Sequence, residues 1–421
     1  MRICLINYRY FVSSGPERYL FAVKRLLEER GHEVVPFSVR YRQNEPSPWD
    51  DYFVPPIAGV DEIMFRQHSW SASSVRRALE RSVYSREVNV ALSRLLRDAR
   101  PDAAYVLKFM RKLSPSILTA LRDHAVPVAI RFSDFDLICA QQHLLRDGRV
   151  CELCVGKGLW HSVRYRCVQR SFAASAVNAV GVEYARWRGY FGLVDAFVAP
   201  SDIMRQKMIE GGLSASRINH IPTFVEARPA RPWAERVRRV AFVGRIAPEK
   251  GLDVLLDAIE LLHGDGVGDD VEFVVAGDLA TPLGRAIEVR LRLRPIAGVR
   301  LTGQLGEADV TDLLQSSQLS VVPSLWYENM PNSLLESLAC GTPVIASDFG
   351  SMRDMLAGTG AGLLFRSGDP VALAEALREG LTGRCAETMG AIAGELARER
   401  HDPARHIDAL VELLESMQPR R

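Results

Sequence analysis

The feature that most constrains the fold is an alternation of short apolar runs with amphipathic helical stretches along the whole chain. Six such runs occupy the first half, at 2–8, 33–39, 103–109, 126–132, 196–201 and 218–224. Six more follow, at 240–244, 271–277, 299–303, 319–324, 343–347 and 362–365. Each is apolar over several consecutive positions, as in strands covered on both faces. Strand–helix–strand order predicts parallel sheets with right-handed crossovers.

The stretch 16–30 shows the helical half of this pattern. It follows the first predicted strand, and Gly31 ends it. Its apolar residues recur at helical spacing on one face, namely Tyr19, Leu20, Val23, Leu26 and Leu27.

The 421 residues are too many for one core and suit two domains of about 200 residues. The segment 226–238 contains Pro229, Pro232 and several arginines without apolar periodicity, and it is predicted to be a linker. We therefore predict Rossmann-like, doubly wound domains at 1–225 and 239–400, facing a central cleft where ligands bind. The final segment, 401–421, is predicted to be an amphipathic helix that packs back on the first domain.

Composition excludes several classes. Hydrophobic residues make up 47% and charged residues 25% of the chain, as in a soluble globular protein. The net charge of +2 does not indicate nucleic-acid binding. No apolar run approaches the roughly 20 residues of a membrane span, and the one after Arg2 is too short for a secretory signal. We expect a cytoplasmic protein without a disulfide framework, since seven cysteines are an odd number.

The most informative stretch is 323–336. A strand ends near Ser324, a loop carries Glu328, Asn329 and Met330, and a helix is predicted to begin near Pro331. The free backbone N–H groups and the positive end of that helix favour an anion such as a phosphate. Glu336, one to two turns further, and Glu328 are suited to accept hydrogen bonds from ribose or sugar hydroxyls.

A second stretch, 243–251, ends the first strand of the second series. It carries Gly244, Arg245 and Lys250. Arginine offers a fork for bidentate phosphate contact and lysine a point charge. The alternative is ordinary surface charge.

These two stretches resemble the retaining glycosyltransferases of the GT-B fold grouped as family four, the group 1 type. Glu328 and Glu336 match the family's E-x7-E motif, and 243–251 resembles its donor-diphosphate clamp. The resemblance implies that Arg245 and Lys250 neutralise the diphosphate leaving group. It covers nearly the whole chain and is most specific in the second half.

The loop 10–18 resembles the glycine-containing loop after the family's first strand. Gly15 would let backbone approach the diphosphate or the sugar, because it has no Cβ. Taken alone, the loop would read equally well as a helix-capping turn.

The first half also departs from the family. Its members often carry His-Asp after the fourth strand, with the histidine close to the transferred sugar, but here Ser133 precedes Asp134. A serine cannot accept a proton at neutral pH, although it can hydrogen-bond a sugar hydroxyl. Either the histidine acts mainly in sugar positioning, or activity is altered here.

Four cysteines follow this strand at the spacing C-x11-C-x2-C-x12-C, which suits a structural zinc site. The alternative is independent reduced thiols. The four are Cys139, Cys151, Cys154 and Cys167.

The region 64–111 is rich in arginine and poor in acids. It is either a solvated helical face or a surface that meets anionic lipid or a lipid-diphosphate acceptor at the inner face of the membrane. The arginines are Arg66, Arg76, Arg77, Arg81, Arg86, Arg94, Arg97 and Arg100.

Together the motifs predict transfer of a sugar from a UDP- or GDP-linked donor to a hydroxyl of a glycan, lipid-linked or small-molecule acceptor, as in polysaccharide or glycoconjugate biosynthesis. The resemblance implies retention at the anomeric carbon and a hexosyltransferase that needs no catalytic metal. Two alternatives stay open: a sugar-nucleotide epimerase of the same fold, and a non-catalytic partner that binds a nucleotide sugar. A dinucleotide dehydrogenase is disfavoured, since no G-x-G-x-x-G follows a predicted strand.

Overall fold

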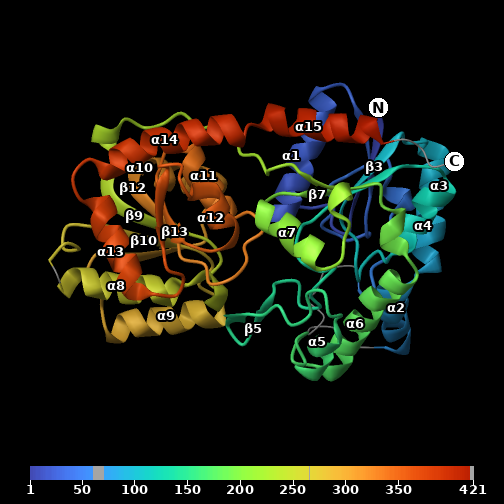
Figure 1. The fold of residues 1–421 in the computed structure, drawn as a ribbon, viewed down its shortest axis with the longest axis horizontal. Coiled ribbons are helices and arrows are strands. Elements are labelled where there is room, and N and C mark those ends of the chain that lie inside the picture. Colours follow the sequence, from blue (N-terminus) through green and yellow to red (C-terminus); the bar gives the residue numbers. More distant parts are fainter. Residues whose placement is uncertain (60–70, 265, 418–421) are drawn as a thin grey trace. The chain divides into compact units, whose positions relative to one another are not determined.

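The computed structural model describes residues 1–59, 71–264 and 266–417. The chain divides into two units, coloured by sequence in Figure 1. The first comprises Met1–Leu144, Cys151–Ile221 and the C-terminal segment from Ala404. The second comprises Leu145–Val150 and Pro222–Pro403. Each unit is built around its own sheet.

The first sheet has six parallel strands in the order β2-β1-β3-β4-β7-β8. All six coincide with predicted runs, and nearly all of their residues are buried, as expected for strands covered on both faces. Their bounds are β1 (Arg2–Asn7), β2 (Glu33–Phe37), β3 (Ala103–Lys108), β4 (Val128–Arg131), β7 (Ala196–Ala199) and β8 (Ile218–His220). A short antiparallel hairpin was not predicted, β5 (Leu145–Arg146) and β6 (Arg149–Val150).

The helices of the first unit begin with α1 (Gly15–Glu29), which buries the predicted apolar face. The last helix, α15 (Pro403–Ser416), contacts α1: the Tyr19 hydroxyl lies 2.8 Å from Nε2 of His406. The others are α2 (Ala72–Val83), α3 (Arg86–Ala99), α4 (Ser116–Asp123), α5 (Trp160–Arg164), α6 (Phe172–Trp187) and α7 (Asp202–Glu210), with short 3₁₀ turns η1 (Asp50–Tyr52), η3 (Tyr190–Leu193) and η4 (Ala215–Arg217).

The second sheet also has six parallel strands, in the order β11-β10-β9-β12-β13-β14. Again all six coincide with predicted runs. β9 begins at Val237, inside the segment predicted as linker, because Val237 pairs in register with Ser317 of β12. The bounds are β9 (Val237–Val243), β10 (Glu272–Ala276), β11 (Val299–Gly303), β12 (Ser317–Val322), β13 (Val344–Ser347) and β14 (Gly362–Phe365).

Helices cover the second sheet from both sides. α8 (Leu252–Gly264) and α13 (Pro370–Leu381) pack together in one apolar cluster, whereas α11 (Asn332–Ala339), α12 (Gly350–Leu356) and α14 (Cys385–Arg400) contribute to another. The remaining elements are α9 (Pro282–Leu293), α10 (Glu307–Ser316), η5 (Trp233–Glu235) and η6 (Pro248–Lys250).

The strand orders locate one switch point in each sheet. The order reverses between β1 and β3 in the first sheet, and between β9 and β12 in the second. Open α/β sheets bind ligands outside the carboxyl ends of the strands at such points. The loops that follow these four strands are therefore where a site is expected. None of the helices that the structure describes has the length and apolarity needed to cross a membrane.

Candidate functional site

In the second unit, the loops after β9 and β12 touch each other at the switch point. The Leu325 N–H donates to the Glu249 carbonyl at 2.8 Å. Gly251 has φ +71°, and a Cβ there would lie 1.9 Å from the Pro323 carbonyl oxygen. Only glycine permits this approach. The contact fixes the distance between the side chains that the two loops carry.

One ion pair joins these two loops. Nζ of Lys250 lies 2.5 Å from Oε1 of Glu328. The same Oε1 accepts hydrogen bonds from Oγ of Ser324 and Nε1 of Trp326, both at 2.8 Å. Glu328 is buried, with 6% of its surface exposed. Three donors therefore hold one carboxylate oxygen in place.

This arrangement keeps Glu328 charged. Burial raises the pKa of the Glu328 carboxyl, but the charge of Lys250 and the hydrogen bonds from Lys250, Ser324 and Trp326 outweigh burial, so its net pKa is lowered. Within the described residues, Oε2 of Glu328 has no hydrogen-bond partner. The site thus offers a fixed acceptor oxygen for a ligand hydroxyl beside a lysine with further protons to donate.

Gly244 and Arg245 lie in the same loop after β9. The Gly244 N–H donates to the Ala276 carbonyl at 3.0 Å, and a Cβ on Gly277 would lie 2.2 Å from the Gly244 carbonyl oxygen. Arg245 is 64% exposed at its side chain and pairs with Oε1 of Glu249 at 3.2 Å. The structure therefore brings Lys250 and Glu328 together, whereas Arg245 makes a separate, exposed pair.

The helix predicted to begin near Pro331 begins one residue later. α11 begins at Asn332, with Pro331 as its N-cap residue, so Asn329 and Met330 form the turn that leads into it. Pro331 provides no side-chain cap, and first-turn N–H groups lie at the positive end of the helix. Glu336 lies in the second turn and is half-buried.

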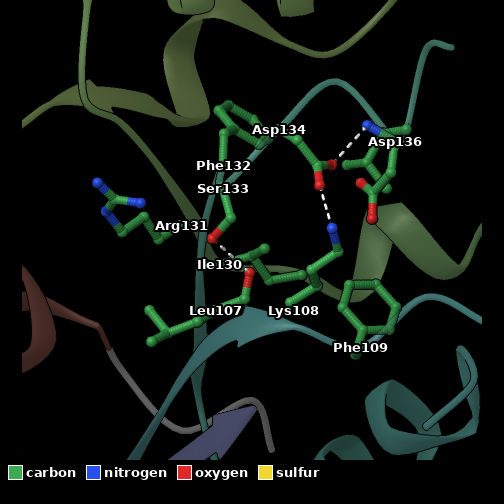
Figure 2. A pocket seen from close by; sticks show the side chains of 10 residues that line it. Leu107, Lys108, Phe109, Ile130, Arg131, Phe132, Ser133, Asp134 and Asp136 are labelled. Atoms are coloured by element: carbon green, nitrogen blue, oxygen red, sulfur yellow. Dashed lines mark hydrogen bonds and ion pairs between the residues drawn. The ribbon is translucent and has the colours of Figure 1, made fainter. Parts of the chain in front are cut away.

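In the first unit, a second charged group occupies the carboxyl ends of β3 and β4 (Figure 2). Lys108, the last residue of β3, forms an ion pair with Asp134 and donates to Oε1 of Gln142 at 3.2 Å. The Asp136 N–H donates to Oδ1 of Asp134 at 3.0 Å. Ser133 donates its hydroxyl to the Leu107 carbonyl at 3.0 Å. Lys108, Ser133, Asp134 and Asp136 line one small pocket.

Electrostatics in this pocket differ from those around Glu328. Burial raises the pKa of Asp136 to about 7, and the charge of Asp134 adds to this, while Lys108 and Arg111 oppose it. Burial lowers the pKa of Lys108, but Asp134 and its neighbours outweigh burial and raise it overall. Lys108 is therefore charged, and Asp136 can hold or release a proton near neutral pH.

Sequence reasoning missed Lys108, Arg111 and Asp136. A signal was present, because Lys108 ends a predicted strand next to the one that leads to Asp134 and Asp136, and carboxyl ends of neighbouring parallel strands share one edge. Gly15, predicted to lie in the loop after β1, is the first residue of α1. Beside it, Glu17 is buried and accepts from Oγ of Ser14 at 2.6 Å.

The predicted zinc site is not supported. No three or more His, Cys, Asp or Glu side chains among the described residues are placed to hold a metal ion. None of the four cysteines forms a disulfide among the described residues. Burial raises the pKa of Cys154 to about 12, and the charges of Cys139, Cys167 and Cys151 add to this.

The arginine-rich region 64–111 is largely engaged in local contacts where it is described; Met64 and Arg66 lie outside the described residues. Arg81 is fully buried, donates to the Lys112 and Pro55 carbonyls, and pairs with Glu87 at 2.9 Å. Arg77 donates to the Pro56 carbonyl at 3.0 Å. These side chains stabilise the fold, so the series is not simply a free basic face.

The comparisons with known proteins agree with this geometry. Over 98% of both chains, the structure is similar to sucrose-phosphate synthase from Thermosynechococcus elongatus, with a TM-score of 0.69 at 17% identity. It is also similar to Anabaena HepE in complex with UDP-glucose, with a TM-score of 0.66 at 15% identity over 99% of this chain and 100% of that one. The fold is that of the GT-B glycosyltransferases, two Rossmann-like domains.

The family described as "Glycosyl transferases group 1" matches residues 237–382. This segment, which contains β9, β12 and the Lys250–Glu328 pair, is therefore a group 1 glycosyltransferase domain. Among curated proteins, the phosphatidyl-myo-inositol mannosyltransferase of Mycobacterium leprae is 30% identical over 216 residues, 49% of this chain and 54% of that protein. The matches thus span about half the length of the curated relatives.

Proposed function

We propose that this protein is a retaining glycosyltransferase of the hexosyltransferase type. It moves a sugar from a UDP- or GDP-linked donor to a hydroxyl of a glycan, lipid-linked or small-molecule acceptor, in polysaccharide or glycoconjugate biosynthesis. The observation that carries the proposal is the Lys250–Glu328 pair, which lies at the switch point of a group 1 glycosyltransferase domain.

In the proposed donor site, positively charged groups face the diphosphate of the donor. Lys250 keeps its bond to Glu328 and donates its other protons to phosphate oxygens, and the N-terminus of α11 after Asn329, Met330 and Pro331 adds a partial positive charge. Arg245 exchanges its exposed pair with Glu249 for the phosphate at little cost, because such pairs are worth about 0–1 kcal/mol. Gly244 lets backbone approach the ligand.

The two glutamates hold hydroxyls. Oε2 of Glu328 accepts from the transferred sugar, and Glu336 accepts from the ribose. Departure of the diphosphate leaves an oxocarbenium-like centre, and stabilising the departing charge is the main catalytic task. The leaving phosphate takes the acceptor's proton, so retention needs no second carboxylate and no catalytic metal ion.

The acceptor half is assigned to the first unit. Asp134, held by Lys108, and Ser133 lie at the carboxyl ends of β3 and β4, and Gly15 follows β1 at the same switch point. Ser133 donates its only proton to Leu107, so toward a sugar hydroxyl it acts as an acceptor. We place the protein in the cytoplasm, with peripheral contact to the anionic inner face of the membrane.

Donor binding can be tested by thermal shift with a panel of UDP, GDP and ADP sugars, starting from UDP-glucose because HepE was solved with it. A donor that binds the native state adds about 2.7 kcal/mol of stability at a hundredfold excess over its Kd. We expect one nucleotide class to raise the melting temperature by several degrees. Transfer should persist in EDTA. If no donor in the panel raised the melting temperature, the proposal would be contradicted.

Two variants separate donor binding from general stability. Lys250→Met removes the proposed phosphate ligand, and Lys207→Met removes a more deeply buried lysine that pairs with Glu152 and Glu210 at 3.0 and 2.8 Å. Both should lower the melting temperature, but only Lys250→Met should abolish the donor-induced shift. Equal donor shifts in the two variants would contradict the assigned role. Arg245→Ala should weaken donor binding about threefold to tenfold, whereas Arg384→Ala, in an equally exposed pair with Glu387, should not.

The two rival readings make different predictions. An epimerase converts the donor without any acceptor, so incubation of donor alone followed by sugar analysis identifies it. A non-catalytic partner binds donor but does not transfer, so Glu328→Ala would leave transfer unchanged in a reconstituted system. We expect no epimerised sugar and loss of transfer in Glu328→Ala.

A further inference from the structure

Helix α6 exposes large apolar side chains on the face turned away from its own unit. Phe172 is 62% exposed, Val180 43% and Trp187 77%. At about 100° per residue these three lie within about 80° of one another on the helix circumference. The opposite side, with Gly181, Val182 and Ala185, is buried. Packing within the first unit therefore does not account for the exposed stripe.

Two neighbouring helices, α5 and α2, also expose large apolar side chains. The Leu159 N–H, at the start of α5, donates to Glu183 of α6 at 2.8 Å, and Trp160 of α5 is 57% exposed. α2 packs against α6 so closely that a Cβ on Gly181 would lie 2.5 Å from the Ser82 carbonyl oxygen. Figure 1 shows α2, α5 and α6 grouped together. α2 also exposes large aliphatic side chains, those of Val75 and Leu79.

The same surface is strongly basic. Residues 157–188 contain six lysines and arginines against one acid, Glu183, which already pairs with Arg186 at 3.1 Å. The other five basic side chains are exposed, and none forms an ion pair within the part of the chain that the structure describes. They are Lys157, Arg164, Arg166, Arg170 and Arg188. This segment thus carries five exposed positive charges that no acid within residues 157–188 neutralises.

We propose that this aromatic-basic surface, made of Trp160, Phe172, Val180, Trp187 and these five basic residues, docks on an anionic lipid bilayer. Tryptophan rings are favoured at the boundary between headgroups and acyl chains. Each nearby arginine or lysine adds attraction to anionic headgroups, and a helix with one apolar face can lie flat in that interface. A folded protein partner would need a surface that is both apolar and acidic, whereas an anionic bilayer supplies both properties everywhere.

The proposal deepens the proposed function by naming the partner, although it does not require that sugar transfer occurs. The region in which membrane contact was expected from sequence, 64–111, uses Arg77 and Arg81 for internal contacts. The surface on α5 and α6 instead keeps its charges exposed. A lipid-linked acceptor would lie in the same bilayer that this surface contacts.

Flotation of the full chain with vesicles tests the idea. The probes are phosphatidylcholine vesicles, with or without about a third of phosphatidylserine. We expect flotation with the anionic vesicles only, decreasing as salt is raised. The double variants Phe172→Ser/Trp187→Ser and Arg164→Glu/Arg170→Glu should each reduce the bound fraction about tenfold. The matched control is Val289→Ser/Leu293→Ser, which removes exposed apolar side chains from α9 and should bind like wild type.

Further readouts keep the outcomes distinct. Donor-induced thermal shift on the same samples reports folding and the proposed donor site, so loss of flotation with an intact donor shift concerns this surface alone. Failure of wild type to float, or equal flotation of the surface and control variants, would overturn the proposal. So would light scattering that gives a wild-type dimer abolished by Phe172→Ser/Trp187→Ser, or preferential binding of a single-stranded oligonucleotide.

Discussion

The two sheets place similar residues at their switch points, yet the electrostatic results are opposite. In the second unit one lysine meets one carboxylate, and the pKa of Glu328 is lowered. In the first unit Lys108 and Arg111 face two carboxyl groups, Asp134 and Asp136, and the pKa of Asp136 is raised to about 7. The second site has a fixed charge, whereas the first has a group that titrates near neutral pH.

Burial raises the pKa of both carboxyl groups, and the difference comes from their neighbours: Asp134 adds a negative charge beside Asp136, whereas Lys250 and two neutral donors hold Glu328. Two neighbouring carboxylates cannot both ionise without repulsion, even beside cations. A single carboxylate held by a lysine and two neutral donors has no such competitor. A fixed charge suits binding of a donor of constant charge. A titrating carboxyl group suits the proposed acceptor site, because it can either donate a hydrogen bond to a sugar hydroxyl or accept one from it.

Removing the carboxylate of the second site should have the largest effect. Glu328→Ala deletes the proposed sugar-hydroxyl acceptor and leaves the half-buried Lys250 without its partner. Transfer should fall about 10²–10³-fold, and the free energy of unfolding by about 3–5 kcal/mol. Initial rates and urea unfolding measure the two effects. Glu328→Gln keeps an acceptor oxygen and should lose less of both.

The pH dependence at Glu328 has a definite sign. Its folded pKa is lowered from 4.5, so its stabilisation is present above that value and is lost as pH falls through the folded pKa. Acid should therefore destabilise wild type more than Glu328→Gln. A rate close to that of wild type in well-folded Glu328→Ala would show that the two sites do not differ in the way proposed.

Replacing the lysine of the first site should lower the free energy of unfolding and leave donor binding intact. Lys108→Met leaves Asp134 and Asp136 with Arg111 as their remaining cation, at a cost of about 3–5 kcal/mol. Native-state hydrogen exchange should show weaker amide protection in β3 and β4, with β9 and β12 unchanged. Donor affinity from thermal shift should stay within about twofold of wild type. A larger change in affinity would mean that the two sites are coupled.

Asp136→Asn should invert the pH trend seen at Glu328. The carboxyl has a raised folded pKa, so its ionisation opposes folding increasingly as pH rises from 3.8 to about 7. Wild type should lose stability relative to Asp136→Asn across this window, by roughly 1–4 kcal/mol at the upper end. Thermal melts at closely spaced pH values measure it. Parallel stability curves for the two proteins would refute the raised pKa.

The sequence predicted the second unit better than the first. All twelve sheet strands were predicted, because continuous apolar runs identify buried parallel strands. Lys250 and Glu328 were predicted as site residues because each lies in a short segment with its own signature. Their contact is made by two loops 78 positions apart in sequence, and spacing alone gave no distance between them.

The charged group of the first unit was harder to predict from the sequence, because its residues come from three separate segments of the chain. Lys108 ends one strand, Asp134 and Asp136 follow the next, and Arg111 adopts φ 69° in a loop. No local pattern marks such a set before strand neighbours are known. The zinc prediction is not supported either: the cysteine spacing suited a metal, but no group of metal-binding side chains is found among the described residues.

The smallest effect should come from Ser133→Ala. Its hydroxyl donates to the Leu107 carbonyl, so the variant loses one half-buried hydrogen bond, worth about 1 kcal/mol of stability. Ser320→Ala is a matched control, since Ser320 is a buried serine whose Oγ has no partner among the described residues. Kinetics decide what else Ser133 does. If it accepts a bond from a sugar hydroxyl, kcat/KM should fall about fivefold, with KM carrying the change. A loss as large as that of Glu328→Ala would instead place a main catalytic group in the first unit and remove the contrast between the two sites.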